Sequence, residues 1–366
     1  MRAVHLTSVH LREDVRIFHK ECRTLAKAGC DVSLVVADGK GNETRDGVAI
    51  VDVGRPEGGR WTRMTATRNR VLRQAIKLDA QVYHFHDPEL LPAGLALKKR
   101  GQAVVYDAHE MFPATVKTKP YFPWPMNFMA AWGFGSYEMY IAKRLTAAVA
   151  ATPMIARRLR KVQCRTEVVA NFPLRSEIIT ELPSWDTREN ATCYQGSISW
   201  GRGLREMVAG VNHAGSRLLL AGLFSDEMDM EVARQLSGWQ SVEEQGVLNR
   251  SALQGMMGRC RMGLVLLHPD LNYVNSQPVK LFEYMAAGIP VIASDFSYWR
   301  ELIGRFDCCL FVDPLDVKAI TTAISWLLDN PDKAEAMGQR GCEAVREHFN
   351  WDNEARKLLA LYDSLA

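Results

Sequence analysis

The clearest pattern in the chain is Asn275-Ser-Gln-Pro-Val-Lys-Leu-Phe-Glu-Tyr-Met-Ala-Ala-Gly-Ile-Pro-Val-Ile-Ala-Ser-Asp295. Pro278 suits the first helical turn, where its missing N–H needs no partner, and Ser276 or Gln277 is placed to cap the helix. Gly288 supplies a left-handed stop, and the proline two positions later prevents the helix from resuming. The short, β-branched run around that proline predicts a buried parallel strand.

The polar side chains of this predicted helix suggest a ligand. Lys280, Glu283 and Ala287 lie on one face, so a basic and an acidic group sit near the helix start. A helix N-terminus beside a cation suits a phosphate, and the carboxylate is placed to accept hydrogen bonds from a ribose diol. The pattern therefore describes half of a nucleotide-diphosphate site. A surface ion pair between Lys280 and Glu283 explains the same two residues without a ligand.

Length and charge predict two domains of opposite character. The chain has 366 residues, more than one core usually covers, so we expect domains at 1–174 and 175–366. The first half holds 27 Lys and Arg against 16 Asp and Glu, and the second half holds 18 against 26. A basic first half suggests an anionic partner such as a phosphate-bearing lipid or a membrane surface. The basic residues form no known nucleic-acid motif, so we expect no nucleic acid.

The eight cysteines form no CxxC pair, which gives no support to a zinc or redox motif. Most of them lie in apolar surroundings, as expected of reduced thiols in the cytoplasm. The chain begins directly with a strand-like run at 3–6, and we therefore expect no N-terminal signal.

The first half begins with a βαβ pattern. A strand at 3–6 is followed by a loop with His10, Arg12 and Arg16, then a helix at 17–28 and a strand at 32–36. A βαβ unit implies a parallel sheet, so this loop lies at the carboxyl edge where α/β sheets bind ligands. A solvated charged loop is the plainer interpretation. No GxGxxG follows the strand, which removes the main support for a dinucleotide.

Two further strands deliver histidines and carboxylates to the same edge. The strand at 82–85 runs into His86-Asp-Pro-Glu-Leu-Leu-Pro92, and the strand at 103–106 ends in Asp107-Ala-His-Glu110. Such groups either pair with one another or face a cleft, and their position at strand ends favours the cleft. We expect His84, inside its strand, and Glu89, at a helix start, to be structural.

An uncharged segment then concentrates aromatic residues. Five aromatics and two methionines lie within 121–132, and prolines at 120, 123 and 125 exclude a simple membrane-spanning helix there. Flanked by Lys117, Lys119, Lys143 and Arg144, the segment is either an apolar surface that meets lipid or a loop and helix packed on the sheet.

A second α/β pattern follows the polar linker 174–190. A strand at 192–195 leads into Gly196-Ser-Ile-Ser-Trp-Gly-Arg-Gly203, a glycine-rich turn whose arginine suits a phosphate. Strands at 217–221, 242–248, 263–267 and 310–312 come next. Helices at 316–328, 331–349 and 354–365 close the chain, and we expect the last one to pack on the first domain.

These motifs together resemble a known family. The run from Pro278 to Ala293 is similar to the nucleotide-binding signature of the retaining family-4 glycosyltransferases, which have two Rossmann-like domains facing a cleft, the GT-B fold. Gln195-Gly196 through Gly203 resembles their phosphate turn, and Phe349-Asn-Trp351 their closing-helix signature. The motifs at 86–92 and 106–110 resemble a subgroup that assembles bacterial polysaccharides.

The resemblance implies roles for particular residues. It assigns the ribose to Glu283, the diphosphate to Gly196 and the backbone of Ser276, Gln277 and Val279, and charge neutralisation to Arg202 and Lys280. It places His109 against the donor sugar, with Asp87 and Glu110 as further catalytic candidates. Where the family carries a paired glutamate, this chain has Asn275. The usual Gly-Gly loop is replaced by the segment with His10, Arg12 and Arg16, which become acceptor-binding candidates.

The implied activity is transfer of a hexose-type sugar, with retention, from a nucleotide sugar to a glycan acceptor in surface polysaccharide assembly. A UDP-sugar is the preferred donor, and the acceptor is expected to be lipid-linked on an anionic inner membrane face. No Asp-x-Asp is apparent between the donor strands, so we expect no metal and no cofactor. A nucleotide-sugar epimerase and a catalytically idle nucleotide-binding homologue are the alternatives, the latter because of Asn275.

Overall fold

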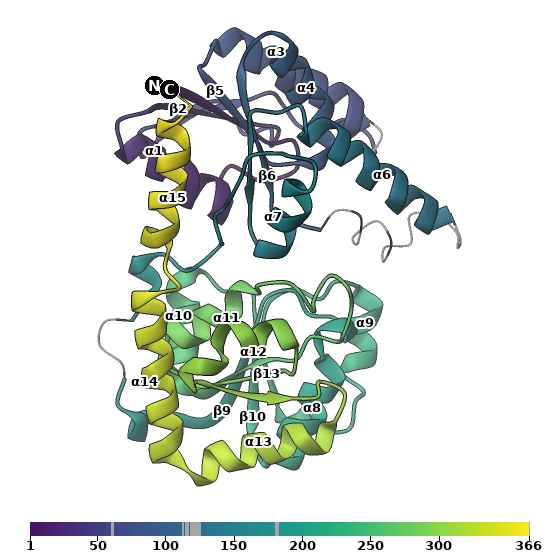
Figure 1. Cartoon of the computed structure of the whole chain (residues 1–366). Coiled ribbons are helices and arrows are strands. Elements are labelled where there is room, and N and C mark those ends of the chain that lie inside the picture. Colours follow the sequence, from purple (N-terminus) through teal and green to yellow (C-terminus); the bar gives the residue numbers. More distant parts are fainter. Residues whose placement is uncertain (60–61, 112, 114–116, 118–125, 180–182, 366) are drawn as a thin grey trace. The chain divides into compact units, whose positions relative to one another are not determined.

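The computed structural model describes residues 1–59, 62–111, 113, 117, 126–179 and 183–365, and it divides into two compact units (Figure 1). Unit 1 comprises residues 1–171 together with 351–365, and unit 2 comprises residues 172–350. Each unit is a parallel-sheet α/β domain, which confirms the predicted fold class.

Unit 1 is built on an eight-stranded sheet in the order β3-β4-β2-β1-β5-β6-β7-β8. All pairs are parallel except β3 with β4, a short antiparallel hairpin that the sequence analysis missed. The missed strand is three residues long and largely exposed, so it carries no apolar pattern. The strands are β1 (Arg2–Leu6), β2 (Asp31–Val36), β3 (Glu43–Arg45), β4 (Val48–Asp52), β5 (Val82–Phe85), β6 (Ala103–Ala108), β7 (Ala147–Ala150) and β8 (Thr166–Val168).

The helices of unit 1 cover both faces of this sheet. One face carries η1, α1 and the C-terminal α15, which pack on one another; α3 and α4 pack on the strands from the other side (Figure 1). Valines and leucines of β1 face α3 and α4, whereas the alternate residue His5 faces η1 and α15. The helices are η1 (Val15–Cys22), α1 (Arg23–Lys27), η2 (Arg63–Thr67), α3 (Arg68–Leu78), η3 (Pro88–Leu90), α4 (Leu91–Lys99), α6 (Met126–Ala142), α7 (Pro153–Arg160) and α15 (Trp351–Asp363).

Unit 2 is built on a six-stranded, fully parallel sheet in the order β11-β10-β9-β12-β13-β14. Its strands are β9 (Glu189–Gln195), β10 (Arg217–Ala221), β11 (Val242–Gly246), β12 (Cys260–Val265), β13 (Val291–Ser294) and β14 (Cys309–Val312). Its helices are η4 (Arg175–Glu177), η5 (Trp185–Thr187), η6 (Trp200–Arg202), α8 (Leu204–His213), α9 (Glu227–Ala233), η7 (Trp239–Ser241), α10 (Arg250–Arg259), α11 (Val279–Ala286), α12 (Ser297–Ile303), η8 (Gly304–Phe306), α13 (Val317–Asp329) and α14 (Pro331–Glu347).

Both sheets reverse their strand order at one place. In unit 1 the chain progresses outward on either side of β1 and β5, and in unit 2 on either side of β9 and β12. Open α/β sheets bind ligands in the crevice beyond the carboxyl ends of the strands at such a switch point. The segments that leave β1, β5, β9 and β12 are therefore the places to look for a site.

Two details of the predicted helices are wrong. The helix after Pro278 begins at Val279, with Pro278 at the N-cap in an extended conformation and no side chain capping it. Ser276 donates instead to the carbonyl of Tyr273, so the proposed cap is occupied elsewhere. The helix expected at 17–28 starts two residues earlier, and its first part is wound as a π-helix before α1 continues it.

Candidate functional site

The switch point of unit 2 is shaped by a close approach of two loops. Gly196, directly after β9, has a φ of 111° and donates its N–H to the carbonyl of Ala221 at 2.9 Å. Gly222 has a φ of 137°, and a Cβ there would lie 1.8 Å from the carbonyl oxygen of Gly196. Only glycine fits at Gly222, because any side chain there would clash with the Gly196 carbonyl.

Lys280 projects into this turn from the first turn of α11. It is 7% exposed, and its Nζ lies 3.6 Å from the centroid of the Tyr194 ring. Among the residues that the structure describes, Nζ finds no hydrogen-bond partner. Burial, reinforced by the charge of Arg202, holds the pKa of Lys280 well below its usual value. A buried lysine excludes the alternative of a solvated surface ion pair with Glu283.

A second cation lies close to this lysine. Arg202 ends η6, is half-buried, and stands 5.7 Å from the ring centroid of Tyr273. Gly203 follows with a φ of 79° and starts α8, whose N-terminus has no side-chain cap. Two cations and two uncapped helix N-termini, those of α8 and α11, therefore belong to one switch point, an arrangement that suits a multiply charged anion.

Glu283 is held in place one turn further along α11. Its Oε2 accepts a 2.6 Å hydrogen bond from Nε2 of Gln195, the last residue of β9. Tyr284 fixes the same strand end, because its hydroxyl accepts the N–H of Gln195 at 3.0 Å. The carboxylate is thus oriented by β9 on the side of α11 that also carries Lys280. The sequence analysis quoted Gln195 only as part of the glycine turn and missed its role in orienting Glu283.

The loop before α11 contains the remaining candidates of unit 2. Asn275, Ser276, Gln277 and Val279 are all half-buried. The loop is tied to α12, since Nε2 of Gln277 donates to the Tyr298 hydroxyl at 2.6 Å and the Trp299 indole donates to the Ser276 carbonyl at 2.8 Å. These bonds use side chains and one carbonyl and leave the first N–H groups of α11 to a ligand.

The switch point of unit 1 is organised around a buried carboxylate. Asp87, directly beyond β5, is 2% exposed. Its Oδ2 accepts hydrogen bonds from the Thr7 hydroxyl at 2.9 Å and from the N–H of Ser8 at 2.5 Å, both beyond β1. Glu89 accepts a further bond from the Ser8 hydroxyl at 2.8 Å. Asp87 therefore clamps the end of β1 to the end of β5, which is a positioning role.

His10 and His109 meet at this edge. Their rings lie edge to face with centroids 5.3 Å apart, and Nε2 of His10 is 3.4 Å from Oδ1 of Asp87. Burial acts to lower the pKa of His10, but the hydrogen bond with Asp14 and the nearby carboxylate charges outweigh burial and raise it to about 9. His109 has a side chain 20% exposed and lies 3.6 Å from Asp107, whereas Glu110 is exposed.

Arg12 and Arg16 are not available to an acceptor. Arg12 is 3% exposed and forms a bidentate pair with Asp38, at 2.7 and 2.6 Å. Arg16 is 5% exposed and forms a bidentate pair with Asp107, at 2.8 Å for both bonds. Buried, fully paired guanidinium groups hold the loop rather than read a ligand. The acceptor role of these two arginines therefore stays a prediction that their burial and pairing do not support, and His10, which is half-buried, is the more accessible candidate.

Two family models match this chain. The model described as Glycosyltransferase Family 4 matches residues 15–172, and the model described as Glycosyl transferase-like matches residues 202–360. The chain belongs to glycosyltransferase family 4. The resemblance inferred from the motifs is thereby confirmed, and the two matched ranges contain most of the candidate residues of this family-4 chain.

Curated relatives match only a limited part of this family-4 chain. An MMP α-(1→4)-mannosyltransferase of Mycolicibacterium hassiacum is 33% identical over 22% of this chain and 20% of its own length. A GDP-mannose-dependent phosphatidylinositol monomannoside mannosyltransferase of Mycobacterium tuberculosis is 36% identical over 22% of this chain and 21% of its own length. The family-4 chain thus aligns with about a fifth of the length of these relatives.

Solved structures match this chain over its whole length. Sucrose-phosphate synthase from Thermosynechococcus elongatus has a TM-score of 0.79 at 17% identity, covering all of this chain and 98% of that chain. Anabaena Alr3699/HepE in complex with UDP-glucose has a TM-score of 0.75 at 13% identity, with full coverage of both chains. At such identities the likeness shows the fold, which is that of the GT-B glycosyltransferases.

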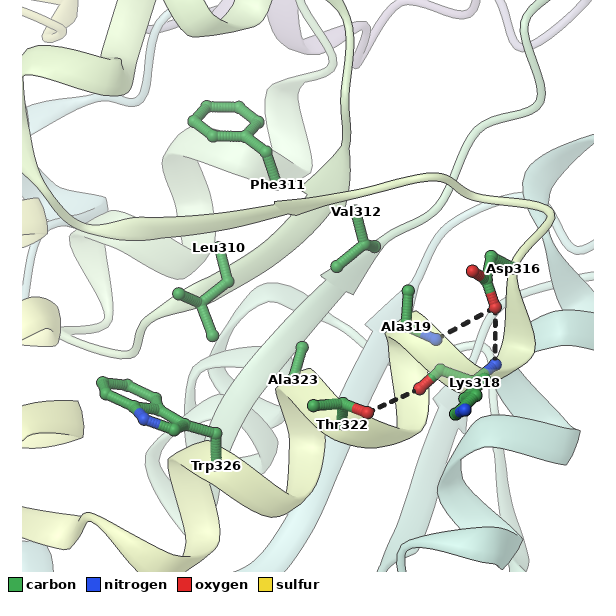
Figure 2. A pocket seen from close by; sticks show the side chains of 9 residues that line it. All are labelled: Leu310, Phe311, Val312, Asp316, Lys318, Ala319, Thr322, Ala323 and Trp326. Carbon is green, nitrogen blue, oxygen red and sulfur yellow. Dashed lines mark hydrogen bonds between the residues drawn. The ribbon is translucent and has the colours of Figure 1, made fainter.

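An apolar helix surface and a groove lie outside these switch points. Of the aromatic segment 121–132, residues 121–125 lie outside the described residues, as do Lys119 and the three prolines; the remainder starts α6. A groove of about 540 Å³ runs between β14 and α13 of the family-4 chain (Figure 2). None of the candidate residues lines it, and it carries no part of the site.

No helix among the described residues has both the length and the apolar character needed to cross a membrane.

Proposed function

We propose that this family-4 chain transfers a hexose-type sugar, with retention of configuration, from a nucleoside diphosphate sugar to a lipid-linked glycan. The observation that carries the proposal is the buried Nζ of Lys280, which lies beside the turn at Gly196 and has no hydrogen-bond partner among the described residues. A buried cation without a partner is costly unless a ligand supplies the opposite charge. A diphosphate supplies that charge where Arg202 and the N-terminus of α11 already favour it.

The proposed sugar transfer requires stabilisation of the diphosphate as it leaves. In this proposal Lys280 and Arg202 neutralise charge that grows on the leaving group, and N–H groups of α11 bind its oxygens. Glu283, oriented by Gln195, accepts hydrogen bonds from the ribose hydroxyls. The sequence shows no Asp-x-Asp between the donor strands, so this cation set takes the place of a metal in the proposal. His109 is assigned the donor sugar, near the carbon that reacts.

An apolar surface on α6 supports a lipid-linked acceptor. Met129 and Trp132 are 74% and 77% exposed, and Phe128 adds a half-exposed ring to the same end of the helix. Nζ of Lys117 lies 4.4 Å from the centroid of the Phe128 ring, whereas Lys143 and Arg144, both exposed, follow the last turn at the other end of α6. Exposed apolar side chains with a basic residue against them suit the interface of an anionic bilayer.

The membrane proposal has a matched test. Met129→Glu should reduce co-flotation with anionic phosphatidylglycerol vesicles at low salt, whereas Met228→Glu, at an equally exposed methionine of unit 2, should leave it unchanged. If the unaltered protein ignored such vesicles, or if both variants lost binding equally, the acceptor would have to be sought among soluble molecules.

Two nucleotide bases, uracil and guanine, are candidates for the donor. A UDP-sugar is the first candidate, because UDP donors dominate the group that the motifs resemble. GDP-mannose is the second, since a relative that matches this chain is named as GDP-mannose-dependent. A thermal-shift panel of UDP, GDP and their sugars separates the two by the size of the stabilisation.

Product analysis tests the activity itself. Transfer requires an acceptor, epimerisation proceeds with the nucleotide sugar alone, and an idle homologue yields neither product while it still binds nucleotide. Asn275 stands where the family has a glutamate, and this replacement would explain a lack of turnover. In that case Asn275→Glu should restore turnover. Release of nucleotide diphosphate that depends on the acceptor supports transfer. Isomerised sugar in the absence of an acceptor overturns the transfer proposal. So does a lack of turnover by both the unaltered protein and Asn275→Glu.

A further inference from the structure

A cluster of four buried side chains in unit 1 is not used by the proposed transfer. His5 lies on β1, Glu21 on η1, His84 on β5 and His86 directly beyond β5, and all four are 0% exposed. The parallel register places His5 opposite His84, and His86 lies two positions further along the same face. Three imidazoles are thereby stacked side by side, with ring centroids 4.7 to 5.1 Å apart, and η1 lays Glu21 over them.

The distances in this histidine cluster are those of a ligand set. Oε2 of Glu21 lies 3.9 Å from Nδ1 of His5, 3.8 Å from Nδ1 of His84 and 3.9 Å from Nε2 of His86. The His5 and His86 nitrogens are 2.9 Å apart, and all four atoms lie within 4.8 Å of one another. Adjacent ligands of a tetrahedral zinc ion are separated by about 3.3 Å, given bonds of roughly 2.0 Å. The observed separations bracket that value.

Groups behind the cluster orient two of the histidines. Nδ1 of His86 lies 2.9 Å from Oδ2 of Asp107, and Nε2 of His5 lies 3.1 Å from the hydroxyl of Tyr362 on α15. In both rings the nitrogen that faces away from the cluster is held, which leaves the other nitrogen directed inward. A carboxylate behind an imidazole is the usual support of a histidine that binds a metal.

Glu21 differs from the paired carboxylates Asp38 and Asp107 of unit 1. Neither of its oxygens has a hydrogen-bond partner among the described residues, although Nε of Arg16 is 3.3 Å away, because that N–H donates to Asp107. A proton shared between His5 and His86 satisfies those two rings and still leaves the carboxyl group unsatisfied. Burying a carboxyl group without a partner is costly, and a bound cation removes that cost.

We propose that His5, Glu21, His84 and His86 bind one divalent transition-metal ion, with zinc the best fit, as a structural centre. Three imidazoles and one carboxylate suit zinc rather than calcium or magnesium, which prefer oxygen ligands. The four protein ligands are fully buried and complete a tetrahedron, so the ion holds η1 against β1 and β5 and takes no substrate. His84 exchanges its 2.9 Å contact with the Tyr362 hydroxyl for the metal. Sugar transfer does not depend on this proposal.

The test is made on the full chain, purified without a histidine tag and dialysed against zinc and then against buffer. We expect about one zinc per chain by elemental analysis, following the four-ligand set. Growth in cobalt should give the visible absorption of tetrahedral Co²⁺. Dipicolinate should remove the metal and lower the melting temperature, because binding to the folded state alone stabilises it.

Variants assign the metal to the cluster. Glu21→Gln and His84→Gln should each lose the bound metal and the cobalt band, whereas His213→Gln, at an exposed histidine of α8, should retain both. If the variants do not fold, the elemental analysis and cobalt spectrum of the unaltered chain still decide. Metal below about a tenth of an equivalent, no cobalt band and an unchanged melting temperature would show a proton-sharing cluster and overturn the proposal.

Discussion

The two switch points share a sheet topology but treat buried charge differently. In unit 1 the buried cations Arg12 and Arg16 each have a carboxylate within 2.8 Å, and Oδ2 of Asp87 accepts hydrogen bonds from Thr7 and Ser8. In unit 2 Lys280 is buried with no hydrogen-bond partner among the described residues. Arg188, another buried cation of unit 2, donates to three backbone carbonyls, although its Nε has no partner among the described residues. We propose that the lysine without a hydrogen bond marks the ligand site and that the paired charges are scaffolding.

The largest effect should come from breaking a pair in unit 1. Arg16→Met leaves Asp107 buried without its bidentate partner, which should cost about 3–5 kcal/mol of unfolding free energy. Arg45→Met, which removes solvent-exposed ion pairs with Glu13 and Glu43, should lower the unfolding free energy much less. Urea titrations of both variants measure the difference. Equal losses would contradict the assignment of Arg16 to the scaffold.

The opposite result is expected for the cation of unit 2. Lys280→Met should weaken UDP or GDP binding by about 2–4 kcal/mol, measured by calorimetry, because a buried charge-to-phosphate bond is lost. The same variant should be at least as stable as the unaltered chain, since it removes a buried, unpartnered charge. Lys318→Met, at an exposed lysine of α13, serves as the control and should change neither quantity.

This lysine also predicts a pH dependence of binding. Its pKa lies well below the usual value in the ligand-free protein, and a bound diphosphate raises it again. Binding should therefore take up protons, and affinity should fall as the pH rises through the pKa of the free protein. Calorimetry in buffers of different ionisation enthalpy measures the uptake, and Lys280→Met should abolish it. Proton release on binding would place the phosphate elsewhere.

Glu283 tests the ribose assignment at a smaller scale. Glu283→Ala should weaken every nucleotide by about 1–3 kcal/mol if the carboxylate loses hydrogen bonds from the diol. The same variant should no longer discriminate between UDP and 2′,3′-dideoxy-UDP, whereas Glu301→Ala, on α12, should retain the discrimination. Unchanged affinity for UDP would remove Glu283 from the site.

The smallest effect should come from His10 in unit 1. Its pKa is about 9 in the folded protein against about 6.5 when unfolded, so its contribution to stability is complete below pH 6.5 and is lost as the pH rises to 9. We expect a loss of about 1–2 kcal/mol over that range, allowing for solvent screening of a side chain 29% exposed. Unfolding of His10→Gln should lack this step, and His213→Gln should keep it. A step of equal size in both variants would mean that another group titrates.

Much of the unit 2 site could be predicted from residue order alone. Patterns within one segment can be recognised from the sequence. They include the spacing of Lys280 and Glu283 on one helix face, the glycines at 196 and 203, and the β-branched strand after Gly288. The N-cap at Pro278 was missed because both cap candidates bond elsewhere. Ser276 donates to the carbonyl of Tyr273 earlier in the same loop, and Gln277 donates to Tyr298 on α12, which folding brings to it.

The two α/β domains, the family and the residues that leave the carboxyl ends of the strands can be predicted from the amino-acid sequence, because each depends on periodicity or on a motif within one segment. Which charged residues are paired inside the fold becomes known only from the folded chain. Arg16 on η1 and Asp107 on β6 are 91 positions apart and meet only because the chain folds, and His5 and His84 meet through the register of β1 with β5. A charge is costly or harmless according to what lies within a few ångströms of it, and that distance is set by folding.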